Sequence, residues 1–244
     1  MNKVSELAQR VTAALEFDRR VNLHRFPVRV TSEAGLLVLA GEVQDVAAKR
    51  ISVRIARDLA GTESEVVDAL DVVPSRLQGD GEMLDALTRS LLELSELKPC
   101  GLSRHHRGQI EIIRVPAQRS GSGQIELAIR NGVVDLAGSV ASLSHRRVTE
   151  ALAWWVPGCR NVIDRLVVEP PEDDNDGELA DAVRLVLEID PSLPGAEQLG
   201  IAVTMGVVTL SGAVRENGQR LRAETDTWCV DGVREVLNEI QVRP

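Results

Sequence analysis

One short pattern occurs three times in this chain of 244 residues. "GVVDLAGSV" at 132–140 and "GVVTLSGAV" at 206–214 are near copies, and "GLLVLAGEV" at 35–43 is a looser third. In each copy a second glycine follows the inner one by twenty residues, giving three pairs: Gly41 and Gly61, Gly138 and Gly158, Gly212 and Gly232. Spacing kept over three copies indicates an internal triplication, so one small structural pattern must account for most of the chain.

Each repeat is predicted to contain a helix, two strands, a second helix and a third strand. Helical patterns at 5–15, 82–97 and 178–189 precede the three glycine motifs. Asn131-Gly132 lies between two alternating strands and is a strong hairpin signal, because a type I′ turn needs positive φ at both central residues. Met205-Gly206 stands at the same place in the third repeat.

The two glycines of each repeat have structural interpretations. Alternation places Val134, Leu136, Gly138 and Val140 on one strand face, and we expect the bare glycine there to let a helix backbone approach the sheet. The second glycine is expected to end the second helix in the left-handed conformation. All six glycines are therefore interpreted as structural and not as ligand-binding.

These motifs resemble the BON-domain family. The third repeat is the most similar, through "GVVTLSGAV" and "DGVREVLNEIQV", and the first is the most diverged. The resemblance implies an α+β fold of three tandem αββαβ domains, each with two helices on one face of a three-stranded mixed sheet. It also implies non-enzymatic binding modules, usually bacterial, that are linked to envelope or osmotic stress and to phospholipid binding. It supplies no catalytic residue.

The repeats define three predicted domains: 1–74, 82–170 with an insertion at 98–123, and 177–244. "SRLQGDG" after Pro74 indicates a short linker. The stretch "PEDDNDGE" at 171–178 is predicted to be a solvated, extended spacer. A calcium loop is the alternative for this stretch, but the spacing of the EF-hand is missing.

The insertion concentrates positive charge in a chain whose net charge is -9. Against the single acid Glu111 stand five basic residues: Lys98, Arg104, Arg107, Arg114 and Arg119. We interpret the insertion as a contact for anionic lipid headgroups or a partner, or else as a mobile solvated loop. "GQIEIIRV" within it alternates like a strand and could form an extra edge or hairpin. Cys100, His105 and His106 make a weak metal set, because adjacent histidines do not easily point at one ion.

Two tryptophans occupy equivalent positions, sixteen residues after the first glycine of their repeats: Trp154 and Trp228. If the second helix buries offsets fourteen, fifteen and eighteen, offset sixteen points roughly away from the core. We therefore expect both rings to contact something outside their own domain. We consider three interpretations of this contact: the rings pack between repeats, enter a membrane interface or bind a partner protein.

Composition excludes several classes of protein. A net charge of -9 argues against nucleic-acid binding, which needs clustered Lys and Arg. No stretch approaches the roughly 18 apolar residues of a membrane span, and no leader-like apolar segment opens the sequence. A cytoplasmic protein is therefore expected, either free or peripheral to the inner membrane. With no catalytic signature, neither an enzyme nor a cofactor or metal site is expected.

The sequence thus predicts a non-enzymatic tandem binding protein related to stress or the envelope, with a phospholipid surface or a protein as its partner. Candidate contact residues are Trp154, Trp228 and the insertion's arginines. The alternative is a cytoplasmic interaction module that responds to a small ligand or to K⁺. A third reading is self-association through sheet edges or the tryptophan face.

Overall fold

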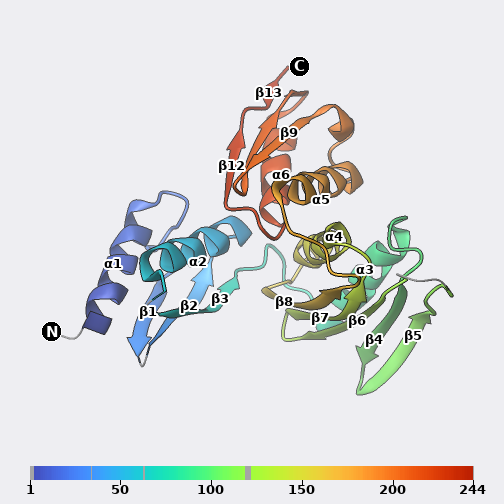
Figure 1. Ribbon diagram of the computed structural model, residues 1–244, viewed down its shortest axis with the longest axis horizontal. Helices are drawn as coiled ribbons and strands as arrows, with labels where there is room; N and C mark the ends of the chain where they lie inside the picture. Colours follow the sequence, from blue (N-terminus) through green and yellow to red (C-terminus); the bar gives the residue numbers. More distant parts are fainter. Residues whose placement is uncertain (1–2, 34, 63, 119–121, 244) are drawn as a thin grey trace. The chain divides into compact units, whose positions relative to one another are not determined.

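The computed structural model describes residues 3–33, 35–62, 64–118 and 122–243, and all statements below concern these residues. The chain divides into two compact bodies, Met1–Pro74 and Ser75–Pro244. The N-terminal body holds the first repeat, and the C-terminal body holds the second and third (Figure 1). Helices and small mixed sheets alternate throughout, which confirms the α+β class.

The first repeat has the predicted αββαβ order. Its elements are α1 (Lys3–Phe17), β1 (Val28–Glu33), β2 (Leu36–Val43), α2 (Val46–Ala60) and β3 (Glu65–Val72). The strands form a sheet in the order β1-β2-β3, in which β1 runs antiparallel and β3 parallel to the central strand.

The second repeat has two more strands than predicted. Its elements are α3 (Asp80–Glu93), β4 (Gly101–His106), β5 (Gln109–Arg114), β6 (Gln124–Arg130), β7 (Val133–Val140), α4 (Leu143–Trp155) and β8 (Asn161–Val168). They build a five-stranded sheet in the order β5-β4-β6-β7-β8. The insertion supplies β4 and β5 as a hairpin, and β4 pairs in parallel with β6. The hairpin reading of the insertion is confirmed, and the reading as a mobile loop is wrong for these strands.

The third repeat has the shortest strands. Its elements are α5 (Asp176–Ile189), the single-turn helix η1 (Ala196–Gln198), β9 (Gly200–Thr204), β10 (Val207–Ser211), β11 (Ala213–Val214), α6 (Asn217–Trp228), β12 (Glu235–Asn238) and β13 (Gln241–Val242). One sheet has the order β12-β10-β9, and β11 pairs with β13 beyond Gly212.

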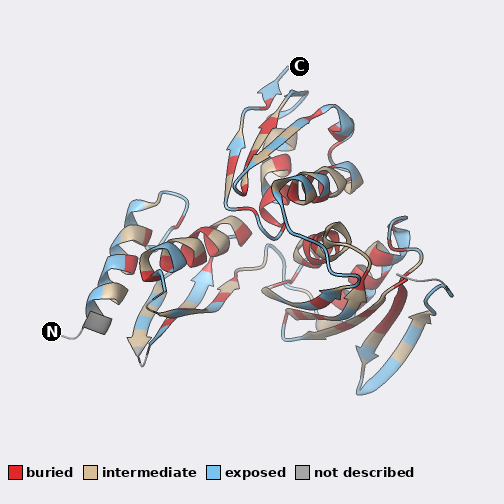
Figure 2. Cartoon of the chain, in the orientation of Figure 1, coloured by how far each residue is buried: buried red, intermediate tan, exposed pale blue. Residues whose placement is uncertain are grey.

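Amphipathic helices and alternating strands build the cores. In the first repeat α2 begins after Asp45, whose carboxylate accepts a hydrogen bond from the amide of Ala48 at 2.8 Å. The helix contacts β2 and β3, and its inner face and that of β2 are buried (Figure 2). Ile51, Leu37 and Leu39 are 0% exposed, and each such side chain stabilises the fold by about 1.5–3 kcal/mol through burial.

The predicted hairpin turns are confirmed. Asn131 and Gly132 have φ of 53° and 78°, and Met205 and Gly206 have φ of 51° and 76°. Positive φ at both central residues is the mark of a type I′ turn, whose twist matches that of the flanking strands.

In the first two repeats the first glycine has a different role from the predicted one. Gly138 is exposed and has a φ of +107°, and a Cβ added there would lie 2.0 Å from the carbonyl oxygen of Gln124 in β6. A Cβ at Gly41 would lie 2.6 Å from the oxygen of Pro27. In these two repeats the glycine lets the preceding segment come close and the backbone take positive φ, and the predicted approach of a helix is wrong. A Cβ added at Gly212 would instead meet Leu199, just after η1, at 3.2 Å.

The second glycines all have positive φ, as predicted. Gly61 directly follows α2, and its amide donates to the carbonyl of Arg57 at 2.9 Å. Gly158 and Gly232, with φ of 96° and 94°, lie beyond the ends of their helices, in the turn that leads into the last strand. The prediction that the glycine ends the helix is therefore right only for the first repeat.

Candidate interaction sites

The arginines of the β4–β5 hairpin do not form an open basic patch. Arg104 donates to Glu111 at 2.8 Å and to Asp85 of α3 at 2.6 Å, and these two carboxylates, Glu111 foremost, raise its pKa. Arg114 donates to the carbonyl oxygens of Cys100 and Leu97 at 2.7 and 2.6 Å. Such internal partners neutralise or occupy both guanidinium groups.

Arg107 differs from these two arginines because it occupies the tip of the hairpin. It is exposed, with a φ of 52°, beside Gly108. Arg119 lies outside the described residues. A contact between these arginines and lipid or a partner stays a prediction, and Arg107 is the described arginine best placed to make it.

The same hairpin exposes aliphatic side chains. Ile110 and Ile112 of β5 are 61% and 72% exposed, and Val115 just beyond is 73% exposed. Ile110 and Ile112 pair with His105 and Ser103 and lie on the sheet face opposite Leu102. Because β5 is the edge strand of its sheet, this apolar surface stands at a free edge (Figure 2).

The two tryptophans are less available than predicted. Trp154 is half-buried, and its indole nitrogen donates to Glu150 at 3.2 Å. Trp228 is 4% exposed, so its ring is not open to a membrane interface or a separate partner, and the alternative of packing between repeats stays a prediction. The reason is local: Asp226, Thr227, Cys229 and Val230 are buried as well, so the end of α6 is covered on more than its core face.

The second and third repeats meet through their helices. Helix α4 packs against α5, and α5 against α6. Arg147 of α4, whose side chain is 4% exposed, donates through Nη2 to both carboxylate oxygens of Asp174 at 2.8 Å. Its Nε donates to the carbonyl of Asp231 at 2.9 Å. One buried guanidinium thus joins the second repeat to two segments of the third.

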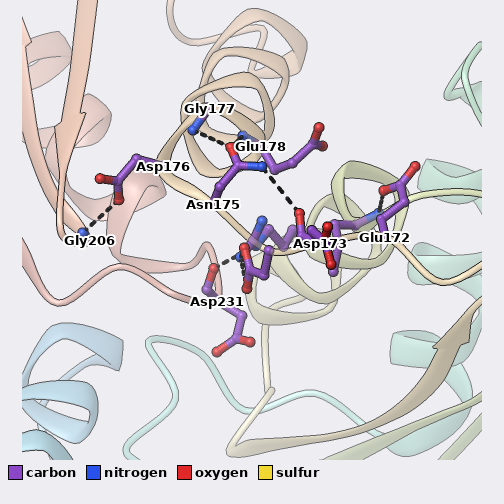
Figure 3. Close-up of polar contacts among 11 residues, drawn as sticks. Glu172, Asp173, Asn175, Asp176, Gly177, Glu178, Gly206 and Asp231 are labelled. Atoms are coloured by element: carbon purple, nitrogen blue, oxygen red, sulfur yellow. Dashed lines mark hydrogen bonds and ion pairs between the residues drawn. The ribbon is translucent and has the colours of Figure 1, made fainter.

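The prediction of a solvated, extended stretch holds for residues 171–175, which are exposed and lie outside helices and strands, whereas 176–178 belong to α5 (Figure 3). Glu172 accepts from the amide of Leu143 at the start of α4 at 2.8 Å. Asn175 caps α5 by accepting from the amides of Gly177 and Glu178. Glu172 thus contacts the start of α4 and Asp174 contacts Arg147, and composition alone does not reveal either contact.

A carboxylate at the first turn of a helix closes the hairpin turn in two of the repeats. Asp80 of α3 accepts from the amides of Asn131 and Gly132 at 2.8 and 2.9 Å. Asp176 of α5 accepts in the same way from Met205 and Gly206 at 2.7 and 3.0 Å (Figure 3). Sequence reasoning missed this role, although "DGEMLDAL" and "DGELADAV" repeat the aspartate at equivalent positions.

A group of three charged side chains lies within the third repeat. Arg222 Nε donates to Asp190 at 2.5 Å and lies 3.1 Å from Asp226. Its guanidinium carbon lies 5.2 Å from the ring centroid of Trp155, at the end of α4 in the second repeat. Asp190 and Asp226 are 4% and 0% exposed, so two carboxyl groups share a buried site with one guanidinium.

The weak metal reading of the histidines has no support in the geometry. His106 lies 3.1 Å from Glu111, and His105 3.8 Å from Glu126. In the described ranges, no three or more His, Cys, Asp or Glu side chains are grouped so as to hold a metal ion. None of the helices in those ranges has the length and hydrophobicity to cross a bilayer.

Comparison with known proteins finds one curated relative and two solved structures that are similar to this chain. Osmotically-inducible protein Y of Escherichia coli (strain K12) is 29% identical over 128 residues, which are 50% of this chain and 63% of that protein, so the match spans less than two thirds of the relative. Two structures of CdsD, a structural protein of the type III secretion system of Chlamydia trachomatis, also align with the chain. The first covers 91% of this chain at 16% identity and the second covers 100% at 14% identity, and each alignment includes 93% of the CdsD chain. Their TM-scores of 0.24 and 0.25 are too low to support a conclusion.

The family model of the BON domain matches three stretches, at residues 3–74, 114–170 and 175–244. These stretches follow the three repeats, and the residues before 114 that the second match leaves out include the hairpin strand β4 and most of β5. Because the matches together cover most of the sequence, the chain belongs to the BON-domain family, with the domain present in three tandem copies.

Proposed function

We propose that this chain is a non-enzymatic, stress- or envelope-related binding protein whose second BON repeat contacts phospholipid surfaces through the β4–β5 hairpin. The observation that carries the proposal is the exposure of Ile110, Ile112 and Val115 on one hairpin. Membership of the BON family supports a binding role, and the similarity to a protein named for osmotic induction supports the link to stress.

The exposed aliphatic surface favours an apolar contact. Single exposed aliphatic residues are common on proteins, but Ile110 and Ile112 share one face of an edge strand, and Val115 is exposed just beyond it. Transfer of apolar surface out of water contributes about 25 cal/mol per Å². Because β5 is an edge strand with polar backbone groups on its open side, deep insertion into hydrocarbon would be costly. We therefore propose contact at the level of the lipid headgroups.

Electrostatics plays a minor part in this proposal. Arg104 and Arg114 have internal partners, which leaves Arg107 as the exposed basic residue among the described arginines of the hairpin. A chain with a net charge of -9 is not attracted as a whole to an anionic surface. Binding should accordingly depend only weakly on salt and on the fraction of anionic lipid.

Co-sedimentation with vesicles tests the proposal. Full-length chain is mixed with phosphatidylcholine vesicles, with and without phosphatidylglycerol, at low and moderate salt. The double variant Ile110→Ser/Ile112→Ser should lower the partition coefficient by about thirtyfold, since loss of each of the two side chains removes roughly 1 kcal/mol of apolar transfer at partial burial. Leu237→Ser, which changes a residue 48% exposed on β12 of the third repeat, is the matched control and should bind like the wild type.

Equal loss in the control and the double variant would contradict a contact through the hairpin. Absence of binding to both kinds of vesicle would rule out the phospholipid reading. A protein partner that adds an extended segment to the free edge of β5 would then take its place.

A further inference from the structure

The three charged residues of the third repeat occupy positions that are apolar in the second. Arg222 and Asp226 lie ten and fourteen residues after Gly212, and Asp190 follows the last residue of α5. The equivalent positions of the second repeat hold three buried aliphatic residues: Val148, Leu152 and Leu94. A core that could be aliphatic has thus been replaced by one cation and two acids. Burying charges costs stability, so the exchange calls for a role beyond packing.

The hydrogen bonds within this trio are incomplete while both acids are ionised. The single hydrogen on Nε of Arg222 goes to Asp190, which also accepts from the amide of Ser192 at 2.8 Å. Neither carboxylate oxygen of Asp226 receives a hydrogen bond from the described residues, although its side chain is 0% exposed. A proton on Asp226 supplies the missing hydrogen bond, because the protonated carboxyl group can donate to the carboxylate of Asp190.

We propose that Asp190, Arg222 and Asp226 form a proton-operated latch that holds the third repeat against Trp155 of the second. With a proton on Asp226, the trio carries one negative and one positive charge, and Arg222 stays over the indole ring. Loss of the proton leaves two buried carboxylates beside one guanidinium. Mutual repulsion then drives one carboxylate toward water, and Arg222, whose side chain is already 38% exposed, moves off the ring with it.

The charges around Asp226 determine the pH range of the latch. Asp190 faces it from α5, and Arg222 lies one turn away on α6, with Cys229 near Arg222. Burial first, and then the hydrogen bond with Asp190, raise the pKa of Asp226 to about 8. The pKa of Asp190 is lowered: burial acts to raise it, but the hydrogen bonds from Asp226 and Arg222 outweigh that effect.

The sign of the resulting pH dependence follows from linkage. The folded chain keeps the proton of Asp226 at pH values where the unfolded chain, with an ordinary pKa of 3.8, has lost it. The stabilising effect of this proton is therefore complete below pH 3.8 and is lost progressively as the pH rises through about 8. The latch closes on the acid side of that value and opens on the alkaline side.

Fluorine NMR of the full chain labelled with 5-fluorotryptophan tests the proposal. The three tryptophan resonances are assigned with Trp154→Phe and Trp155→Phe and followed between pH 6 and pH 10. The Trp155 resonance should titrate with a midpoint near pH 8. In Asp226→Asn, which mimics the protonated acid, it should keep its acid position over the whole range. Asp226→Leu, which restores the residue type of the second repeat, should do the same and serves if the asparagine variant does not fold.

Two results would overturn the latch. One is a Trp155 resonance that does not titrate in the wild type. The other is a titration that persists unchanged in both Asp226 variants, since another group would then be responsible.

Discussion

At the scale of single residues, the repeated glycines show how the backbone constrains the sequence. Gly138 and Gly41 combine positive φ with a carbonyl oxygen of the neighbouring segment where a Cβ would stand. Periodicity predicted correctly which strand face they share, but not what they approach. A pattern of side chains predicts which face a residue lies on, whereas the close approach of a neighbouring carbonyl oxygen depends on the backbone conformation, which polarity does not reveal.

Gly138→Ala should therefore be strongly destabilising. The added Cβ would lie 2.0 Å from the oxygen of Gln124, and alanine would be held at a φ of +107°. We expect the free energy of unfolding to fall by about 2–4 kcal/mol, as strain and steric overlap combine. Gly218→Ala in α6 is the control: no atom lies within 4 Å of its added Cβ, so its stability should be unchanged or rise slightly. Similar losses in the two variants, measured by urea denaturation, would contradict this account.

A second residue-scale prediction concerns Arg147. Arg147→Ala removes the bonds to Asp174 and to the carbonyl of Asp231. Because Asp174 is 59% exposed and can be hydrated, we expect a loss of about 1–2 kcal/mol, less than for a fully buried ion pair. Arg165→Ala, which breaks the exposed pair with Asp135, should cost less than about 1 kcal/mol in the same denaturation assay. If both variants lower the free energy of unfolding by the same amount, the contact of Arg147 between the repeats stabilises the fold no more than an exposed ion pair does.

At the scale of elements, local patterns predicted more than composition did. The Asn131-Gly132 turn, the strand in "GQIEIIRV" and the order of helices and strands all follow from signals within a few residues. The charges of the acidic stretch suggested solvation, which holds for 171–175, but they did not predict the contacts of individual acids. In the structure Glu172 meets a helix end, Asp174 an arginine and Asp176 a hairpin turn.

The aspartate that closes the hairpin turn gives a prediction at this scale. Asp176→Ala leaves the amides of Met205 and Gly206 without their acceptor and should destabilise the third repeat by about 1–2 kcal/mol. Faster amide exchange in β9 and β10, seen by hydrogen–deuterium exchange, is the expected signature. Asp181→Ala changes an exposed acid on the same helix and should leave these strands as protected as in the wild type. Equal effects in the two variants would mean that the turn does not depend on Asp176.

At the scale of the whole molecule, repetition predicted the fold but not the differences between copies. Three equivalent glycine motifs led to three αββαβ repeats, and the family match agrees. The stacking of Arg222 on Trp155 was not predicted, because helical offsets place a side chain relative to its own sheet and not relative to a neighbouring repeat. Comparing buried positions between copies would have revealed Asp226, the charged residue where Leu152 stands in the second repeat.

The proposed binding surface also belongs to one copy. Only in the second repeat do the described residues add a hairpin to the sheet, and this hairpin carries Ile110 and Ile112 at a free edge. Hydrogen–deuterium exchange of the full chain with and without phosphatidylcholine vesicles tests the proposed role most directly. We predict slower exchange at 107–115 in the presence of vesicles and unchanged exchange in β1–β3. Vesicles that bind the chain while slowing exchange elsewhere, and not at 107–115, would contradict the account.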